Sequence, residues 1–185
     1  MRRTEKGRVK MKLLQKISPD LNESGTRIIS ARPEDSERCS EVLYGSTLGK
    51  RYYPTFSMLK KAVAAGIRND HFFLAVNGGT ICGFIWFTAK GAFALYPYLH
   101  IVVVDDHYRK LGIGKKLLDY YEEECLRLGG GLKGRSYLVV SEDNVGAQNL
   151  YSSMGYKMVS ELPGLFRKGF NEILMTKTIL KAGKK

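Results

Sequence analysis

The sequence contains few of the residues that stabilise small secreted domains or bind metal ions. Its 185 residues include only three cysteines and three histidines. The cysteines, Cys39, Cys82 and Cys125, are odd in number and form no C-x-x-C pair, which argues against a disulfide framework or a zinc site. The histidines have no metal-ligand spacing either, so we expect no metal. Cys125 lies at helical spacing from Leu118 and Tyr121, which predicts that it is buried.

Long apolar runs are also missing. No stretch approaches the roughly 20 apolar residues that a membrane-spanning helix needs. The apolar part of the N-terminus, "MKLL", is too short for the core of a signal peptide. We therefore expect a cytoplasmic protein without a membrane partner. A chain of 185 residues is long enough for one well-buried core and short for two domains.

Acidic residues are scarce beside basic ones, and the formal net charge is +12. Residues 1–16 hold seven basic residues and one Glu, a net +6, which is half of the excess. We expect residues 1–25 to be a flexible basic extension and residues 26–185 to be a single domain. A basic protein that binds nucleic acid is an alternative, but no recognition motif accompanies the charge. Nucleic acid is therefore not an expected partner.

Alternating and helical patterns predict a mixed-sheet α/β domain. Strands are expected at residues 26–33, 71–76, 80–89, 98–106, 136–143, 157–163 and 171–180. Two helical stretches follow the first strand, with a break around Gly49 to Pro54, and further helices are expected from Gly112 to about Leu128 and from Asn144 to Gly155. Asn77-Gly78-Gly79 predicts a tight hairpin turn between the second and third strands.

The stretch "YRKLGIGKK", residues 108–116, places four basic residues at the start of a predicted helix, where the helix dipole favours acids. A Walker phosphate loop would need more residues between its glycines and a Ser or Thr after the lysine, and neither is present. A Rossmann fingerprint would need a third glycine where Leu117 stands. A helix start with solvent-directed lysines is a further alternative.

A pyrophosphate loop explains this stretch better. Gly112 and Gly114 lack a Cβ, so backbone N–H groups from Lys110 to Lys115 can close around a diphosphate. The helix dipole and the cations then act on the same anion. The sequence therefore predicts a diphosphate ligand.

Two motifs in this sequence resemble those of the GNAT superfamily of N-acetyltransferases. The first is R-x-x-G-x-G, carried by Arg109, Gly112 and Gly114 after an apolar strand, which resembles the family's acetyl-CoA signature. The second motif, N-x-x-A-x-x-x-Y-x-x-x-G-[F/Y], is matched by Asn144, Ala147, Tyr151, Gly155 and Tyr156. The hairpin "AVNGGTICGFIWF" is also similar to that of the family, and the resemblance covers residues 26–180.

The resemblance implies an α/β fold with a mixed, mostly antiparallel sheet, a splay between the fourth and fifth strands, and flanking helices. It implies acetyl-CoA as co-substrate, no metal, and an amine-bearing acceptor, either a protein or a small molecule, acetylated by a monomer or homodimer. A GNAT-like domain that binds acyl-CoA without catalysis is the alternative. The residues implied in acetyl-CoA binding are Val102, Val103, Val104, Arg109, Lys110, Leu111, Gly112, Ile113, Gly114, Lys115, Asn144 and Tyr151.

The family pattern also implies roles in proton transfer. Tyr151 would protonate the leaving thiolate, and Asn144 would orient the arm of the cofactor. Related peptide N-terminal acetyltransferases often carry Glu or His where this chain has Val139, which cannot accept a proton. Tyr98 and His100, two residues apart on one predicted strand, are therefore the candidates for the base.

The acceptor is not predicted by either motif. The segments that line the acceptor side in the family include an aromatic and apolar set flanked by cations. These residues either form an acceptor wall or pack the helices onto the sheet. A wall would suit a peptide N-terminus, a lysine with acidic neighbours, or a small amine with a carboxylate. The set is Tyr52, Tyr53, Phe56, Leu165, Phe166 and Phe170.

Overall fold

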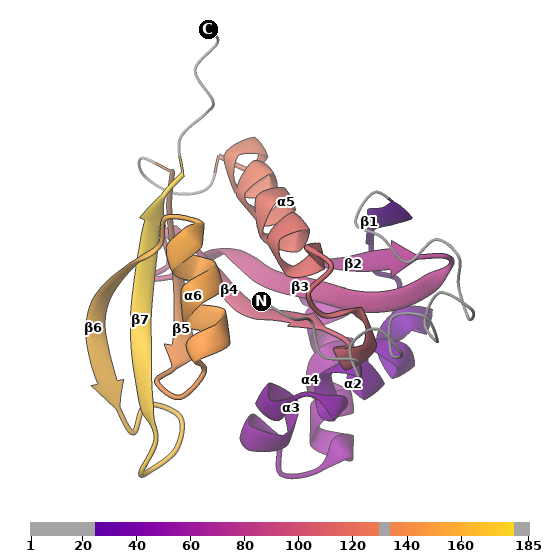
Figure 1. Cartoon of the computed structure of the whole chain (residues 1–185), viewed down its shortest axis with the longest axis horizontal. Helices are drawn as coiled ribbons and strands as arrows, with labels where there is room; N and C mark the ends of the chain where they lie inside the picture. Colours follow the sequence, from indigo (N-terminus) through magenta and orange to yellow (C-terminus); the bar gives the residue numbers. More distant parts are fainter. Residues whose placement is uncertain (1–24, 130–133, 180–185) are drawn as a thin grey trace, which may run out of the picture.

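Seven strands form one sheet in the order β1-β2-β3-β4-β5-β7-β6 (Figure 1). The computed structural model describes residues 25–129 and 134–179, so nearly all of the expected N-terminal extension lies outside the described residues. Neighbouring strands are antiparallel except β4 and β5, which are parallel. This arrangement confirms the predicted fold class. No helix in the described ranges has the length and apolar character needed to cross a membrane.

The elements follow the predicted chain order. The strands are β1 (Thr26–Ser30), β2 (His71–Asn77), β3 (Thr80–Ala92), β4 (Tyr96–Val104), β5 (Arg135–Ser141), β6 (Lys157–Pro163) and β7 (Asn171–Thr178). The α-helices are α2 (Ser36–Gly45), α3 (Thr47–Tyr52), α4 (Phe56–Asn69), α5 (Ile113–Arg127) and α6 (Val145–Ser153). Within the described ranges, the short 3-10 helix η2 (Pro33–Asp35) lies between β1 and α2, and η3 (Asp106–Tyr108) lies between β4 and α5.

The segment between β1 and β2 contains three helices instead of the two that were predicted. The predicted break around Gly49 is itself the short helix α3. Its N-terminus is capped by Ser46, whose hydroxyl accepts a hydrogen bond from the Gly49 N–H at 3.1 Å. Thr55 caps α4 in the same way, through the Met58 N–H. Ser46 and Thr55 thus begin two separate helices, α3 and α4. The sequence pattern did not distinguish α3 as a helix of its own.

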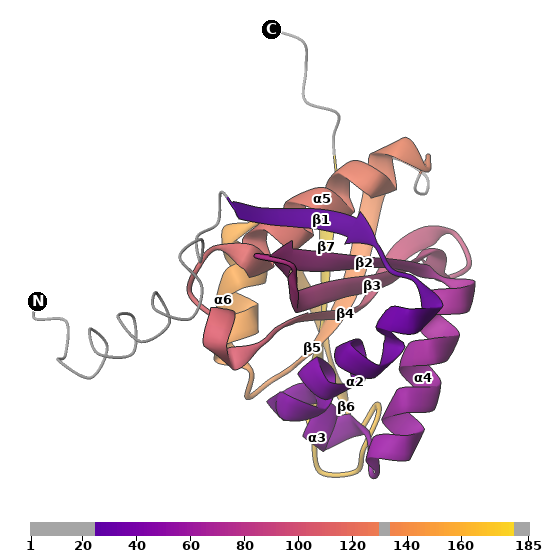
Figure 2. The same cartoon turned by 90° about the vertical axis from the view of Figure 1, so that its right-hand side faces the viewer.

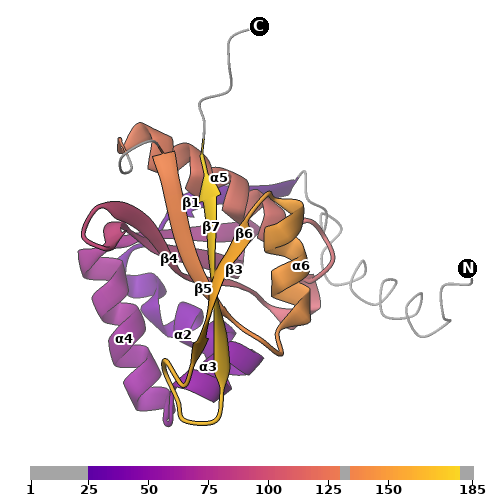
Figure 3. The same cartoon turned by 90° about the vertical axis from the view of Figure 1, so that its left-hand side faces the viewer.

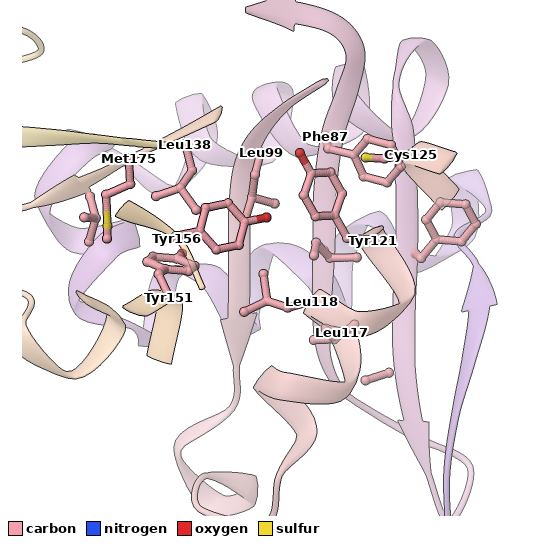
Figure 4. Packing of buried hydrophobic residues seen from close by; sticks show 14 of the residues in the cluster. Phe87, Leu99, Leu117, Leu118, Tyr121, Cys125, Leu138, Tyr151, Tyr156 and Met175 are labelled. Carbon is pink, nitrogen blue, oxygen red and sulfur yellow. The ribbon is translucent and has the colours of Figure 1, made fainter. Parts of the chain in front are cut away.

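Helices cover both faces of the sheet (Figure 2). They bury two apolar clusters, one on each face. On one face α5 packs on the sheet with a cluster that includes Leu117, Leu118, Tyr121, Leu138 and Met175 (Figure 4). On the other face α2 and α4 bury a second cluster. The residues of this second cluster include Leu43, Leu59, Val63, Leu74 and Phe84. Cys125 is 2% exposed in the first cluster, as its helical spacing predicts.

The predicted hairpin after β2 is confirmed. Asn77 pairs with Thr80, so the turn consists of Gly78 and Gly79. Both have positive φ, 55° and 81°, which is the geometry of a tight two-residue turn. This turn sets the pairing of β2 and β3 beside it, as far as the register shift between Ala75 and Val76.

Candidate active site

The parallel strands β4 and β5 separate soon after they meet. They pair only through Tyr98 with Tyr137 and Leu99 with Leu138. Further along, residues 101–104 of β4 pair with β3, but along their other edge the described residues provide no strand partner. Backbone N–H and C=O groups on this edge can therefore bind an extended amide-bearing ligand as an added strand would. This separation is the splay that was predicted between the fourth and fifth strands (Figure 3).

A bulge at His100 sets which side chains of β4 face each cluster. Ile101 pairs with Trp86 and Leu99 pairs with Phe87, so the register shifts by one residue between them. Leu99 consequently lies in the α5 cluster, whereas Ile101 lies in the α2–α4 cluster. Without the bulge, these two residues would share one face of the strand.

The loop between β4 and α5 has the backbone conformation of an anion site. Lys110 and Gly112 both have positive φ, 66° and 79°, and Gly112 is the N-cap of α5. No side chain caps the helix there, and no acidic residue lies in its first turn. The first N–H groups of a helix have no carbonyl of their own helix to donate to. Those of Ile113 and Gly114 are available to an anion at this helix end, which is the site that the sequence predicts for a diphosphate.

The basic side chains of this loop are held by exposed or local contacts. Arg109 pairs with Asp106 at 2.8 Å, and both side chains are at least half exposed. Lys115 pairs with Asp119 at 2.7 Å, one helical turn further along α5. Exposed pairs of this kind contribute little, so a phosphate can replace the carboxylate as partner. Lys116 instead donates to the carbonyl of Thr26, so it ties α5 to β1.

The two motif helices meet beside the splay. A Cβ at Gly114 would lie 3.4 Å from Leu150 Cδ2, so the start of α5 packs closely against α6. The N-cap of α6 is Asn144, whose side-chain oxygen accepts from the Ala147 N–H at 3.2 Å. The sequence predicted this cap, and it aligns α6 so that Tyr151 is directed into the α5 cluster.

Tyr151 is 7% exposed, and its hydroxyl makes no hydrogen bond to another described residue. Its ring contacts that of Tyr156, with centroids 5.9 Å apart (Figure 4). Burial raises the pKa of Tyr151 well above its ordinary value, and the nearby Tyr98 adds to this shift. At neutral pH the hydroxyl therefore carries its proton and can donate it.

The two candidates for the base lie together on β4. The rings of Tyr98 and His100 are 4.9 Å apart, edge to face. Burial raises the pKa of Tyr98, and the Glu172 carboxylate raises it further. Burial lowers the pKa of His100, although Asp70 opposes the shift. His100 Nε2 lies 2.7 Å from the Thr88 hydroxyl. His100 is therefore neutral at pH 7, whereas Tyr98 is protonated.

Sequence reasoning missed Glu172. It lies on β7, is 1% exposed, and is the one buried charged side chain that the described residues contain. It accepts a hydrogen bond from the Tyr52 hydroxyl, and burial and this bond raise the pKa of Tyr52 to about 12. The available signal was weak: Glu172 has the same strand parity as the apolar Leu174, so period-two alternation places both on one face of β7.

A cleft of about 480 Å³ lies between α3, η3 and the connection from β6 to β7. Its lining residues are Gly45, Thr47, Lys50, Arg51, Asp106, Arg167 and Phe170. Arg51 binds Asp143 through both guanidinium nitrogens and donates to the Ser141 hydroxyl at 2.7 Å. Arg51 therefore connects the lining of the cleft to Ser141, at the end of β5 and beside the splay. Among residues 25–129 and 134–179 no group of His, Cys, Asp or Glu side chains is placed to hold a metal ion.

The predicted aromatic wall is assembled in part. Tyr52 contacts Phe166 edge to face at 5.7 Å, so α3 meets the β6–β7 connection. The Arg51 guanidinium lies over the Phe170 ring, 5.3 Å from its centroid. Tyr53 instead packs against the α2–α4 cluster, and Phe56 packs against Tyr44. Leu165 is exposed.

Comparisons with known proteins agree with this geometry. Residues 38–156 match the model of the acetyltransferase (GNAT) family. Ard1 from Thermoplasma volcanium is 23% identical, with a TM-score of 0.69 over 85% of this chain and 99% of that one. The ribosomal-protein-S18-alanine N-acetyltransferase from Escherichia coli is 19% identical, with a TM-score of 0.66 over 86% of this chain and 97% of that one.

An aminoglycoside 6'-N-acetyltransferase complexed with coenzyme A is also similar, at 21% identity and a TM-score of 0.69 over 85% of this chain and 99% of that one. A search of curated proteins by sequence finds no match. At these identities the structural likeness concerns the fold, and the match to the family model carries the family assignment.

Proposed function

The chain belongs to the acetyltransferase (GNAT) family, and we propose that it moves an acetyl group from acetyl-CoA to a primary amine by direct attack. One observation supports this most: residues 101–104 of β4 leave an edge without a strand partner among the described residues, and this edge leads into an uncapped helix N-terminus. A ligand with amides at one end and a diphosphate further along matches both features.

The binding residues follow from this arrangement. The main chain of Val102, Val103 and Val104 would pair with the amides of the pantetheine arm. The N–H groups from Lys110 to Lys115 would donate to the diphosphate, with Arg109 as an added cation. Acetyl-CoA supplies an activated thioester when bound. Asn144 holds the start of α6 and would orient the arm nearby.

Two proton transfers complete the proposed reaction. The amine forms a bond to the acetyl carbon, and the carbon–sulfur bond breaks. Tyr151 would donate its hydroxyl proton to the departing thiolate, since the hydroxyl is protonated at neutral pH and makes no hydrogen bond to another described residue. The nitrogen loses one proton to a base. His100 suits this role better than Tyr98, because His100 is neutral at pH 7 and Tyr98 is not an acceptor at that pH.

The first test measures release of free thiol from acetyl-CoA in the presence of a panel of amines, with an acceptor-free reaction as the background. The panel contains short peptides, lysine-containing peptides and small amines. We expect thiol release above background with at least one amine, and an equal amount of acetylated product. If coenzyme A binds by calorimetry but no amine is acetylated, the non-catalytic acyl-CoA-binding alternative replaces this proposal.

The expected cellular setting is the cytoplasm. The three cysteines are free and buried in the structure. Unpaired thiols are usual where the environment is reducing.

A further inference from the structure

The cleft beside the splay has more positive than negative charge. Arg51 is neutralised by its bidentate contact with Asp143. The one acid that the structure places in the lining of the cleft, Asp106, is paired with Arg109. When a bound diphosphate takes Arg109, this carboxylate adds one negative charge to the cleft. Two further cations, Lys50 and Arg167, line the cleft as well. These two side chains carry the net positive charge of the cleft.

Neither of these two cations is compensated by a carboxylate of the described chain. Lys50 is exposed and makes no side-chain ion pair within the described ranges. Arg167 donates to the main-chain carbonyl of Arg51 at 2.6 Å, a contact that orients the guanidinium and leaves its charge in place. The cleft therefore exposes two cations to a ligand, of which Arg167 is oriented by its hydrogen bond. The net charge of the cleft is about +2 while Asp106 is paired with Arg109, and about +1 once Asp106 is released.

The position of the cleft ties this charge to the reacting amine. Arg51 is hydrogen-bonded to Ser141, the last residue of β5. Its neighbour Tyr52 is hydrogen-bonded to Glu172, which acts electrostatically on Tyr98 of β4. The wall of the cleft thus continues into the splay where transfer would occur. An acceptor whose amine reached the splay from this side would extend its remaining atoms toward the cleft.

An amine in water is itself a cation, so two cations beside its path repel it unless the acceptor also carries negative charge. A polycationic acceptor is repelled more strongly still. Aminoglycosides, for which one of the similar structures is named, belong to that class. The exposed rings of Phe166 and Phe170 flank the same cleft, so an apolar group between the amine and the anion can also be accommodated.

We propose that the acceptor is an acidic amine: a primary amine with one or more carboxylates within a few bonds or residues of it, held by Lys50 and Arg167. The inference rests on the acetyl transfer proposed above and narrows its substrate class. A unit charge pair about 7 Å apart changes affinity between about 3-fold and 50-fold for effective dielectric constants of about 80 to 20. A net excess of one to two such charges makes a preference of roughly 10-fold the expectation.

The test measures binding, so that it does not depend on turnover. The full-length protein is saturated with coenzyme A and titrated with three hexapeptides that differ only in three residues after an N-terminal alanine: glutamate, glutamine or lysine. We expect the glutamate peptide to bind about 10-fold more tightly than the glutamine peptide, and the lysine peptide to bind least. The difference should shrink at about 1 M salt, where the screening length falls to about 3 Å. A fourth ligand, the dipeptide of glycine and glutamate, distinguishes a small acidic amine from a peptide.

Charge reversal assigns the preference to the two cations. Arg167→Glu and Lys50→Glu should each lower the affinity for the glutamate peptide at least 10-fold and raise that for the lysine peptide. Lys157→Glu is the matched control, because Lys157 is exposed and lies at the end of β6 away from the β6–β7 connection. Lys157→Glu should leave the order of the three peptide affinities unchanged. All three variants should bind coenzyme A with the affinity of the wild type.

Several results would overturn the inference. These are equal binding of the three peptides, tighter binding of the lysine peptide, or no measurable binding of either acidic ligand. A loss of coenzyme A affinity in Arg167→Glu would show that the cations serve the cofactor instead. Failure of the proposed function has a different signature: the acidic ligand binds in the expected order, but none of the ligands is acetylated.

Discussion

Replacing Gly112 by Asp tests the anion site at the start of α5. Gly112 has φ +79° and caps a helix that has no acidic residue in its first turn. A carboxylate there would lie about 5 Å from a bound diphosphate. Repulsion costs between about 0.8 and 3.3 kcal/mol per phosphate charge for effective dielectric constants of about 80 to 20. Two charges therefore cost at least about 1.7 kcal/mol, a loss of about 20-fold in affinity for coenzyme A.

Gly112→Asn is the matched control, because Asn has nearly the same shape and tolerates positive φ as Asp does. Backbone strain is then common to both variants, and their difference isolates the charge. Calorimetric titration with coenzyme A gives the affinities, and thermal unfolding confirms that both variants remain folded. We expect the Gly112→Asn variant to bind coenzyme A at least 20-fold more tightly than the Gly112→Asp variant. Equal affinities would refute the assignment of the loop as a diphosphate site.

Further predictions concern the proton transfers and the cleft. Tyr151→Phe should lower kcat about 10²-fold while coenzyme A affinity changes little, because only the hydroxyl is lost. Turnover equal to that of the wild type would mean that Tyr151 serves only to pack the core. His100→Gln should reduce kcat/KM most above the lowered imidazole pKa, and its pH profile should converge with the wild type at lower pH; a pH-independent loss would contradict the base role. The hydrogen bond from Arg51 lowers the pKa of Asp143 to about 2 from 3.8. The pair therefore stabilises the fold above pH 4, and this stabilisation is lost as the pH falls through about 2. Acid unfolding followed by circular dichroism should show Asp143→Asn less stable at pH 5 and equal to wild type near pH 2.

Much of the fold was predictable because its signals are local. The glycine turn after β2 needs positive φ at Gly78 and Gly79, and glycine adopts it without steric cost. Helix α5 was predicted from apolar residues spaced along one face, and its predicted ends differ from Ile113 and Arg127 by one residue each. Asn144 was predicted as a cap from its residue type alone. The separate helix α3 was missed, because two helices joined by a single capping residue leave no gap in the apolar pattern.

The sequence by itself determined the two motif helices, and it indicated the candidate diphosphate loop and the candidate acid, because each depends on residues within about a dozen positions of one another. Only the tertiary structure decided which charges meet. Arg51 reaches Asp143 across 92 positions, and Tyr52 reaches Glu172 across 120. Such contacts depend on how far β5 and β7 extend and on where α3 packs, which no local pattern encodes. Burial of Glu172 and the uncompensated charge of Lys50 and Arg167 therefore follow from packing, and they bear most directly on the choice of acceptor.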